Sequence, residues 1–135
     1  MANALYDKGR EKFLTGAISW SSDNIKVILV DTADYTVNLS TDEFLDDIAG
    51  GAIVATSANL SSKTTTAGVA DAADVTFSAV TGDVSEALVI YKDSGSAATS
   101  PLIAYIDTAT GLAVTPNGGD ITVAWDSGSN KIFKL

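Results

Sequence analysis

The chain has 135 residues, of which 46% are hydrophobic, and its formal net charge is −9. These values fit one folded domain with its own core and exclude an intrinsically disordered chain. The absence of His and Cys excludes disulfides, thiol nucleophiles and imidazole-based catalysis or metal binding. We therefore expect no enzyme, no cofactor and no bound metal ion.

The acidic balance and the hydropathy pattern also limit the partners. Basic residues are few and scattered, which disfavours direct binding to nucleic acid. No segment approaches the roughly 20 apolar residues of a membrane span, so we expect no membrane insertion. The N-terminus lacks the basic-then-apolar order of a secretory signal, and this predicts synthesis in the cytoplasm.

The first predicted element is a helix from Ala4 to Thr15, with Asn3 as its N-cap and Gly16 in a left-handed C-cap. Gly9 would allow another backbone to approach this helix closely. The helix belongs to an N-terminal arm, residues 1–16, which precedes a β-rich body, residues 17–135. We treat both as parts of one domain.

The next elements are a strand and a second short helix. Residues 25–30 are apolar and mostly β-branched, which predicts a central strand buried on both faces. Ser40 and Glu43 have the spacing of a capping box and predict a helix of one to two turns, ended by Gly50 and Gly51. Its acids are Asp42, Glu43, Asp46 and Asp47. Their spacing matches no oxygen-ligand loop, so we expect them to face solvent and complement the helix dipole rather than bind a metal ion.

The remainder of the chain alternates between strand and turn patterns. Segments rich in β-branched or aromatic residues predict strands at 52–55, 63–69, 73–80, 87–92, 102–107, 121–125 and 131–135. The polar run 61–66 is either an edge strand or a long loop. No crossover helices separate these segments, which favours antiparallel pairing. The predicted fold is mainly β: an antiparallel β-sandwich or jelly-roll-like barrel of about eight strands, with a short N-terminal helix and one further short helix.

Four segments carry a resemblance to a known group of proteins. They are residues 2–14, 25–35, 69–77 and 118–125, the last of which reads GDITVAW from Gly119. These segments are similar to those of small structural proteins of tailed bacteriophages. The resemblance implies a virion component, and a β-sandwich of this size is similar to capsid decoration, or cement, proteins. Such proteins bind the outer shell, often as trimers, and stabilise it.

The resemblance implies a location and partners. We expect the protein on the capsid exterior of the virion after synthesis in the host bacterial cytoplasm, bound to the major capsid protein and to copies of itself. Large apolar side chains near the chain ends are the interface candidates, with packing inside the chain as the alternative. These candidates are Tyr6, Phe13, Leu14, Ile132, Phe133 and Leu135.

Two other functions remain open at this stage. The first is a tail, neck or fibre-base component of the same virion. The second is a sandwich that binds host glycans, which would need exposed aromatic rings for stacking on sugars. The candidates for this stacking are Trp20, Tyr35 and Trp125.

Overall fold

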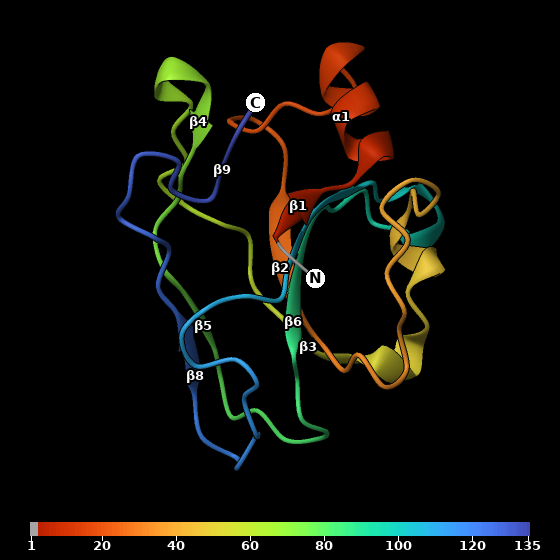
Figure 1. Ribbon diagram of the computed structural model, residues 1–135, viewed down its shortest axis with the longest axis vertical. Helices are drawn as coiled ribbons and strands as arrows, with labels where there is room; N and C mark the ends of the chain where they lie inside the picture. Colours follow the sequence, from red (N-terminus) through yellow and green to blue (C-terminus); the bar gives the residue numbers. More distant parts are fainter. Residues whose placement is uncertain (1–2) are drawn as a thin grey trace.

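A five-stranded antiparallel sheet forms the centre of the computed structural model, which describes residues 3–135 (Figure 1). Its strand order is β1-β7-β6-β2-β3. These strands are β1 (Ala4–Leu5), β7 (Leu102–Ile106), β6 (Ala87–Lys92), β2 (Ile25–Val30) and β3 (Ile53–Thr56). The sheet is open, because its first and last strands do not pair with each other.

Two small sheets pack over one face of this main sheet. In the first, β4 (Val69–Ala70) pairs with β9 (Phe133–Lys134), and in the second, β5 (Val75–Phe77) pairs with β8 (Ile121–Val123). Both pairs are antiparallel and lie on the left of Figure 1. Their apolar residues join those of the main sheet in one hydrophobic core.

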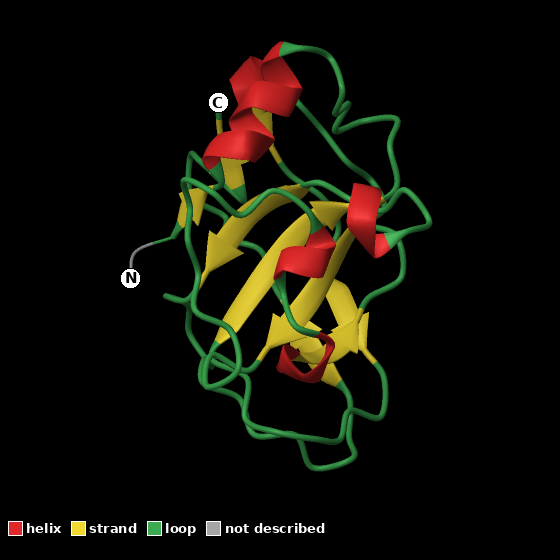
Figure 2. Cartoon of the chain, turned by 90° about the vertical axis from the view of Figure 1, so that its right-hand side faces the viewer, coloured by secondary structure: helices red, strands yellow, loops and turns green. Residues whose placement is uncertain are grey.

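The opposite face of the main sheet has a second core. Strand β2 divides its side chains between the two, since Val27 and Leu29 belong to the first core and Ile28 and Val30 to the second. Residues 31–52 cover the second core, and Figure 2 shows their short helical turns in front of the sheet. The predicted burial of this strand on both faces is therefore confirmed.

Short helical turns connect the strands. Four 3-10 turns occur among residues 3–135, and the one α-helix there is α1 (Asp7–Leu14). The 3-10 turns are η1 (Leu45–Asp47), η2 (Gly50–Ala52), η3 (Thr66–Gly68) and η4 (Ala97–Thr99). No helix in this part of the chain combines the length and apolar character needed to cross a membrane.

The N-terminal helix starts later than predicted. Ala4 and Leu5 form a strand paired with Tyr105 and Ala104 of β7, because the pairing satisfies their backbone groups within the sheet. Asn3 is not the N-cap: its side-chain oxygen accepts the backbone N–H groups of residues 107 and 108 at 3.0 and 2.9 Å. The two glycine predictions for this helix are confirmed. Gly16 has a φ of 79°, and a Cβ on Gly9 would lie 2.5 Å from the carbonyl oxygen of Leu102.

The second predicted helix is reduced to the turn η1. Ser40 does not cap it; instead, the carboxylate of Asp47 accepts the N–H groups of Glu43 and Phe44 at 2.7 and 3.0 Å. This carboxylate closes a tight turn and takes the donors that a longer helix would need. Asp46 and Asp47 are exposed, as predicted for these acids, whereas Asp42 and Glu43 are half-buried. Glu43 forms an ion pair with Lys12 at 2.7 Å.

The predicted strand at 63–69 is also wrong over most of its length. Ser62, Ala67 and Gly68 have φ values of 54°, 58° and 77°, which place them in the left-handed region and break extended structure. Only its last residue, Val69, enters a strand. The prediction of a mainly β, antiparallel chain is confirmed, with nine strands in residues 3–135. Because the sheets are separate and the main one is open, a closed barrel is not observed.

Candidate functional site

Helix α1 and the C-terminal strand β9 lie at the same end of the molecule (Figure 1). The ring of Phe133 in β9 lies 6.0 Å from that of Phe13 in α1, measured between centroids. It also packs edge-on against Trp20 at 5.2 Å. This aromatic contact fixes the helix and the last strand to each other.

A small apolar groove of about 70 Å³ opens beside these rings. We call it the terminal groove; its lining residues are Phe13, Trp20, Thr65, Gly68, Val69, Ala70, Phe133 and Leu135. Leu135 is 63% exposed and Leu14, which follows Phe13, is 88% exposed. Covering an exposed leucine with a partner protein removes apolar surface from water and so stabilises the contact, and this surface is therefore suited to binding a protein.

The interface candidates do not all lie on this surface. Phe13 and Phe133 are half-buried there, and Ile132 is half-buried in the wall of a neighbouring cavity. Tyr6 is fully buried in the second core, on the other side of the main sheet. The expectation that Tyr6 contacts a partner is therefore wrong, because the strand that replaces the start of the predicted helix turns its ring inward.

Two of the three glycan-stacking candidates are buried as well. Trp20 is 4% exposed and donates its indole N–H to the carbonyl of Asp71 at 3.1 Å, while Tyr35 is 5% exposed. Neither ring has a free face on which a sugar can stack. Trp125 is half-buried, and its indole N–H donates to the carbonyl of Ala73 at 3.1 Å.

Two successive hydrogen bonds connect Tyr6, Tyr35 and Asp42. The hydroxyl oxygens of Tyr6 and Tyr35 lie 2.9 Å apart, and Tyr35 donates to the carboxylate of Asp42 at 2.6 Å. Burial raises the pKa of both tyrosines above the ordinary value, and the nearby Asp42 charge adds to the shift. Both hydroxyls therefore stay protonated at neutral pH. The two hydrogen bonds hold residues 31–42 over the second core.

The structure also brings together three acidic residues that no sequence pattern groups. Carboxylate oxygens of Asp31, Asp34 and Asp83 lie within 4.8 Å of one another. Asp31 uses one oxygen to accept the N–H of Ala33 at 2.9 Å, so it also stabilises the turn after β2. The separation of Asp83 from the other two in the sequence hides the group from any local pattern.

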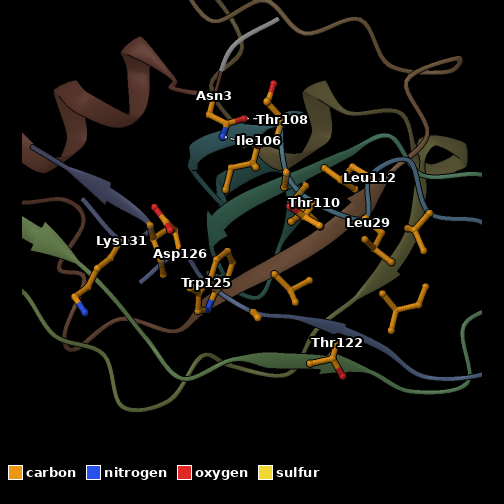
Figure 3. A pocket seen from close by; sticks show the side chains of 18 of the residues that line it. Asn3, Leu29, Ile106, Thr108, Thr110, Leu112, Thr122, Trp125, Asp126 and Lys131 are labelled. Carbon is orange, nitrogen blue, oxygen red and sulfur yellow. Dashed lines mark hydrogen bonds between the residues drawn. The ribbon is translucent and has the colours of Figure 1, made fainter. Parts of the chain in front are cut away.

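A much larger cavity, of about 800 Å³, lies between β8 and the segment that follows β7 (Figure 3). Its apolar lining includes Leu29 and Leu88 of the main sheet, together with Ile106, Leu112 and Val114. Trp125, Asp126 and Lys131 lie at one end of the cavity, and Asn3 and Thr108 lie above it in Figure 3. We call it the β8 cavity. No sequence signal indicated it, because it arises from the spacing between segments distant in sequence.

The charges around these surfaces are unevenly distributed. Six ion pairs occur among residues 3–135: Lys8–Glu11, Arg10–Asp7, Lys12–Glu43, Lys26–Asp93, Lys92–Asp23 and Lys131–Asp71. The segment 93–130, which forms much of the β8 cavity, contains no Lys or Arg. That part of the surface is therefore acidic, whereas the ends of the chain carry paired charges.

Comparison with known proteins places the chain in no family. No protein-family model matches its sequence, and no curated protein matches it. The functional argument therefore depends on the two apolar surfaces and on the residues that form them.

Proposed function

We propose that this protein is a non-enzymatic structural component of a tailed-phage virion, most specifically a decoration protein that binds the capsid exterior and stabilises the shell. The observation that carries the proposal is the terminal groove with its exposed lining residue Leu135, together with the exposed Leu14, which follows the groove residue Phe13 in α1. The resemblance of residues 2–14 and 118–125 to phage structural proteins supports the same assignment.

The packing suits this role. Because the main sheet has a core on both faces, it offers a rigid support for the surface formed by α1 and β9. Two small sheets face the main sheet across the first core, which supports a sandwich-like classification as part of the proposal. Covering one leucine side chain stabilises a contact by about 1.5–3 kcal/mol, and many copies on a symmetric shell multiply such modest gains.

The proposed partners are the major capsid protein and further copies of this chain. An acidic surface also suits a basic docking site on the shell. A tail, neck or fibre-base component would use the same terminal groove. It would differ from a decoration protein in having fewer copies per virion. Glycan binding has less support, since only Trp125 of the three aromatic candidates keeps partial exposure.

The test is rebinding to purified virions that lack the protein. Wild-type protein and the double variant Leu14→Ser/Leu135→Ser are added, and the bound copies per particle are counted. Val84→Ser is the matched control, because Val84 is also an exposed large apolar residue, at 39%, but neither lines the terminal groove nor adjoins a lining residue in the sequence.

We expect hundreds of wild-type and Val84→Ser copies on the head, and a loss of about tenfold or more in affinity for the double variant. Equal binding of all three proteins would exclude the terminal groove as the contact. A few copies at the tail or a vertex would replace decoration with the tail or neck assignment.

A further inference from the structure

The β8 cavity is lined by the edge of a strand. Residues 121–127 all line it, seven in succession. Successive side chains of a strand point to opposite faces, so an unbroken run of lining residues indicates that the strand's backbone edge borders the cavity. The burial pattern agrees: Ile121, Val123 and Trp125 are half-buried, whereas the residues between them are exposed.

Within residues 3–135, no strand pairs with this edge. β5 pairs with β8 from the other side, through Val75↔Val123 and Phe77↔Ile121. Beyond the paired region, the backbone N–H and C=O groups of Ala124 form no hydrogen bond with any residue of the described range 3–135. Backbone groups at an unpaired edge are a template for a further strand.

The opposite side of the cavity leaves room for such a strand. Figure 3 shows Thr122 on one side and Ile106, Thr108 and Leu112 on the other. The volume of about 800 Å³ lies within the range of pockets that enclose a ligand. Ile106, Leu112 and Val114 are half-buried and line the cavity, so they would cover alternate side chains of an inserted strand.

The charge of the cavity indicates what the inserted segment contains. Asp126 is exposed at the cavity, and the segment 93–130 has no basic residue. Lys131, which also lines the cavity, lies 3.5 Å from the carboxylate of Asp71. A second copy of a chain with a net charge of −9 would add repulsion, whereas a basic segment would be attracted.

We propose that the β8 cavity binds an extended peptide segment of a partner protein, apolar at alternate positions and basic between them, which adds as a strand to the free edge of β8. This is a second interaction surface, separate from the terminal groove, and it does not depend on the virion role. Main-chain hydrogen bonds would give affinity, and the apolar lining and Asp126 would select the sequence.

The test uses a fluorescein-labelled peptide of alternating lysine and valine, with binding followed by fluorescence anisotropy and by amide hydrogen exchange. Two control peptides replace lysine by glutamate or carry N-methyl groups on alternate amides. The variants are Ala124→Pro, which removes an edge N–H, and Asp126→Lys. Asp46→Lys is the matched control, because it makes the same charge change at an exposed residue outside the cavity.

We expect saturable binding of the lysine peptide with protection of the Ala124 amide. Affinity should fall about tenfold or more for the N-methylated peptide, for Ala124→Pro and for Asp126→Lys, and stay unchanged for Asp46→Lys. Absence of binding by the lysine peptide overturns the proposal, as does equal binding of the glutamate or N-methylated peptide. Self-association that Ala124→Pro abolishes would identify a second copy as the occupant and also overturn it. If Ala124→Pro fails to fold by circular dichroism, Asp126→Lys and the control peptides decide the matter.

Discussion

The hydroxyl group of Tyr6 donates a hydrogen bond to that of Tyr35 across 2.9 Å, although the residues are 29 positions apart. The direction follows from the next bond, since Tyr35 uses its single hydroxyl hydrogen on the carboxylate of Asp42 at 2.6 Å. Tyr6 follows directly on the first strand of the main sheet, and Tyr35 and Asp42 belong to the segment that covers the second core. These two hydrogen bonds therefore fix residues 31–52, which cover the second core, to the main sheet.

The first prediction is that Tyr35→Phe lowers the free energy of unfolding by about 1–3 kcal/mol, because it leaves the buried Tyr6 hydroxyl without its acceptor. It also removes one of the two donors to Asp42, the other being the backbone N–H of Asn38 at 2.9 Å. Urea denaturation measures the change. Tyr105→Phe is the matched control: its ring packs against Tyr35 at 6.5 Å between centroids, but its hydroxyl makes no hydrogen bond among residues 3–135. Equal losses in the two variants would show that these hydrogen bonds contribute nothing specific.

The second prediction concerns alkaline pH. Burial is the largest cause that raises the pKa of Tyr6, Tyr35, Tyr91 and Tyr105 in the folded chain. Above the ordinary tyrosine pKa of about 10, the unfolded chain has lost protons that the folded chain retains, so the free energy of unfolding decreases as pH rises. Below that pH the contribution is fully present. Absorbance of tyrosinate and circular dichroism, followed together, should show ionisation coinciding with unfolding; ionisation near pH 10 in a chain that stays folded would contradict the prediction.

The sequence predicted the elements whose signal is local. Ile25–Val30 and Ala87–Lys92 were placed to the residue, because apolar residues, many of them β-branched, dominate each segment. Strand β1 was missed, since Ala4 and Leu5 are helix formers by local preference. Their partner strand, β7, lies about a hundred positions further along the chain, and only that pairing makes them extended.

The sequence indicated some residues of the candidate surfaces and missed others. Of the interface candidates, Phe13, Phe133 and Leu135 line the terminal groove, and Leu14 is exposed next to Phe13 in the sequence. Their role as contacts stays a prediction. The burial of Tyr6 depends on which face of the sheet residues 31–52 cover, a property of tertiary packing. The β8 cavity depends on an absent neighbour strand, which no periodicity records.

The third prediction concerns Ser85, which is fully buried and whose hydroxyl has no hydrogen-bond partner among the described residues. Ser85→Ala removes an unsatisfied buried group, so the free energy of unfolding should rise by about 1 kcal/mol. Ser57→Ala is the control of opposite sign, because the Ser57 hydroxyl accepts the N–H of Val27 at 2.9 Å and donates to Ala58 at 2.7 Å. Thermal denaturation of both variants checks the pair, and destabilisation by Ser85→Ala would reveal a partner for its hydroxyl.

The last prediction is that Gly9→Ala destabilises the protein although alanine favours helices. Gly9 is buried at the contact between α1 and β7, where a Cβ would lie 2.5 Å from the carbonyl oxygen of Leu102 and 3.2 Å from the Cα of Ile103. Both neighbours are backbone atoms of a central sheet and cannot move aside as a flexible side chain would. The overpacking cost of about 1–3 kcal/mol should therefore exceed the gain of about 1 kcal/mol in helix propensity.

Gly51→Ala supplies the matched control for this substitution, since a Cβ on Gly51 would meet no atom within 4 Å. Its free energy of unfolding should stay within about 0.5 kcal/mol of the wild type. Urea denaturation at neutral pH compares the two variants. If Gly9→Ala is as stable as Gly51→Ala, then α1 is free to move away from β7, and the proposed rigid support for Phe13 at the terminal groove and for Leu14 next to it in the sequence is lost with it.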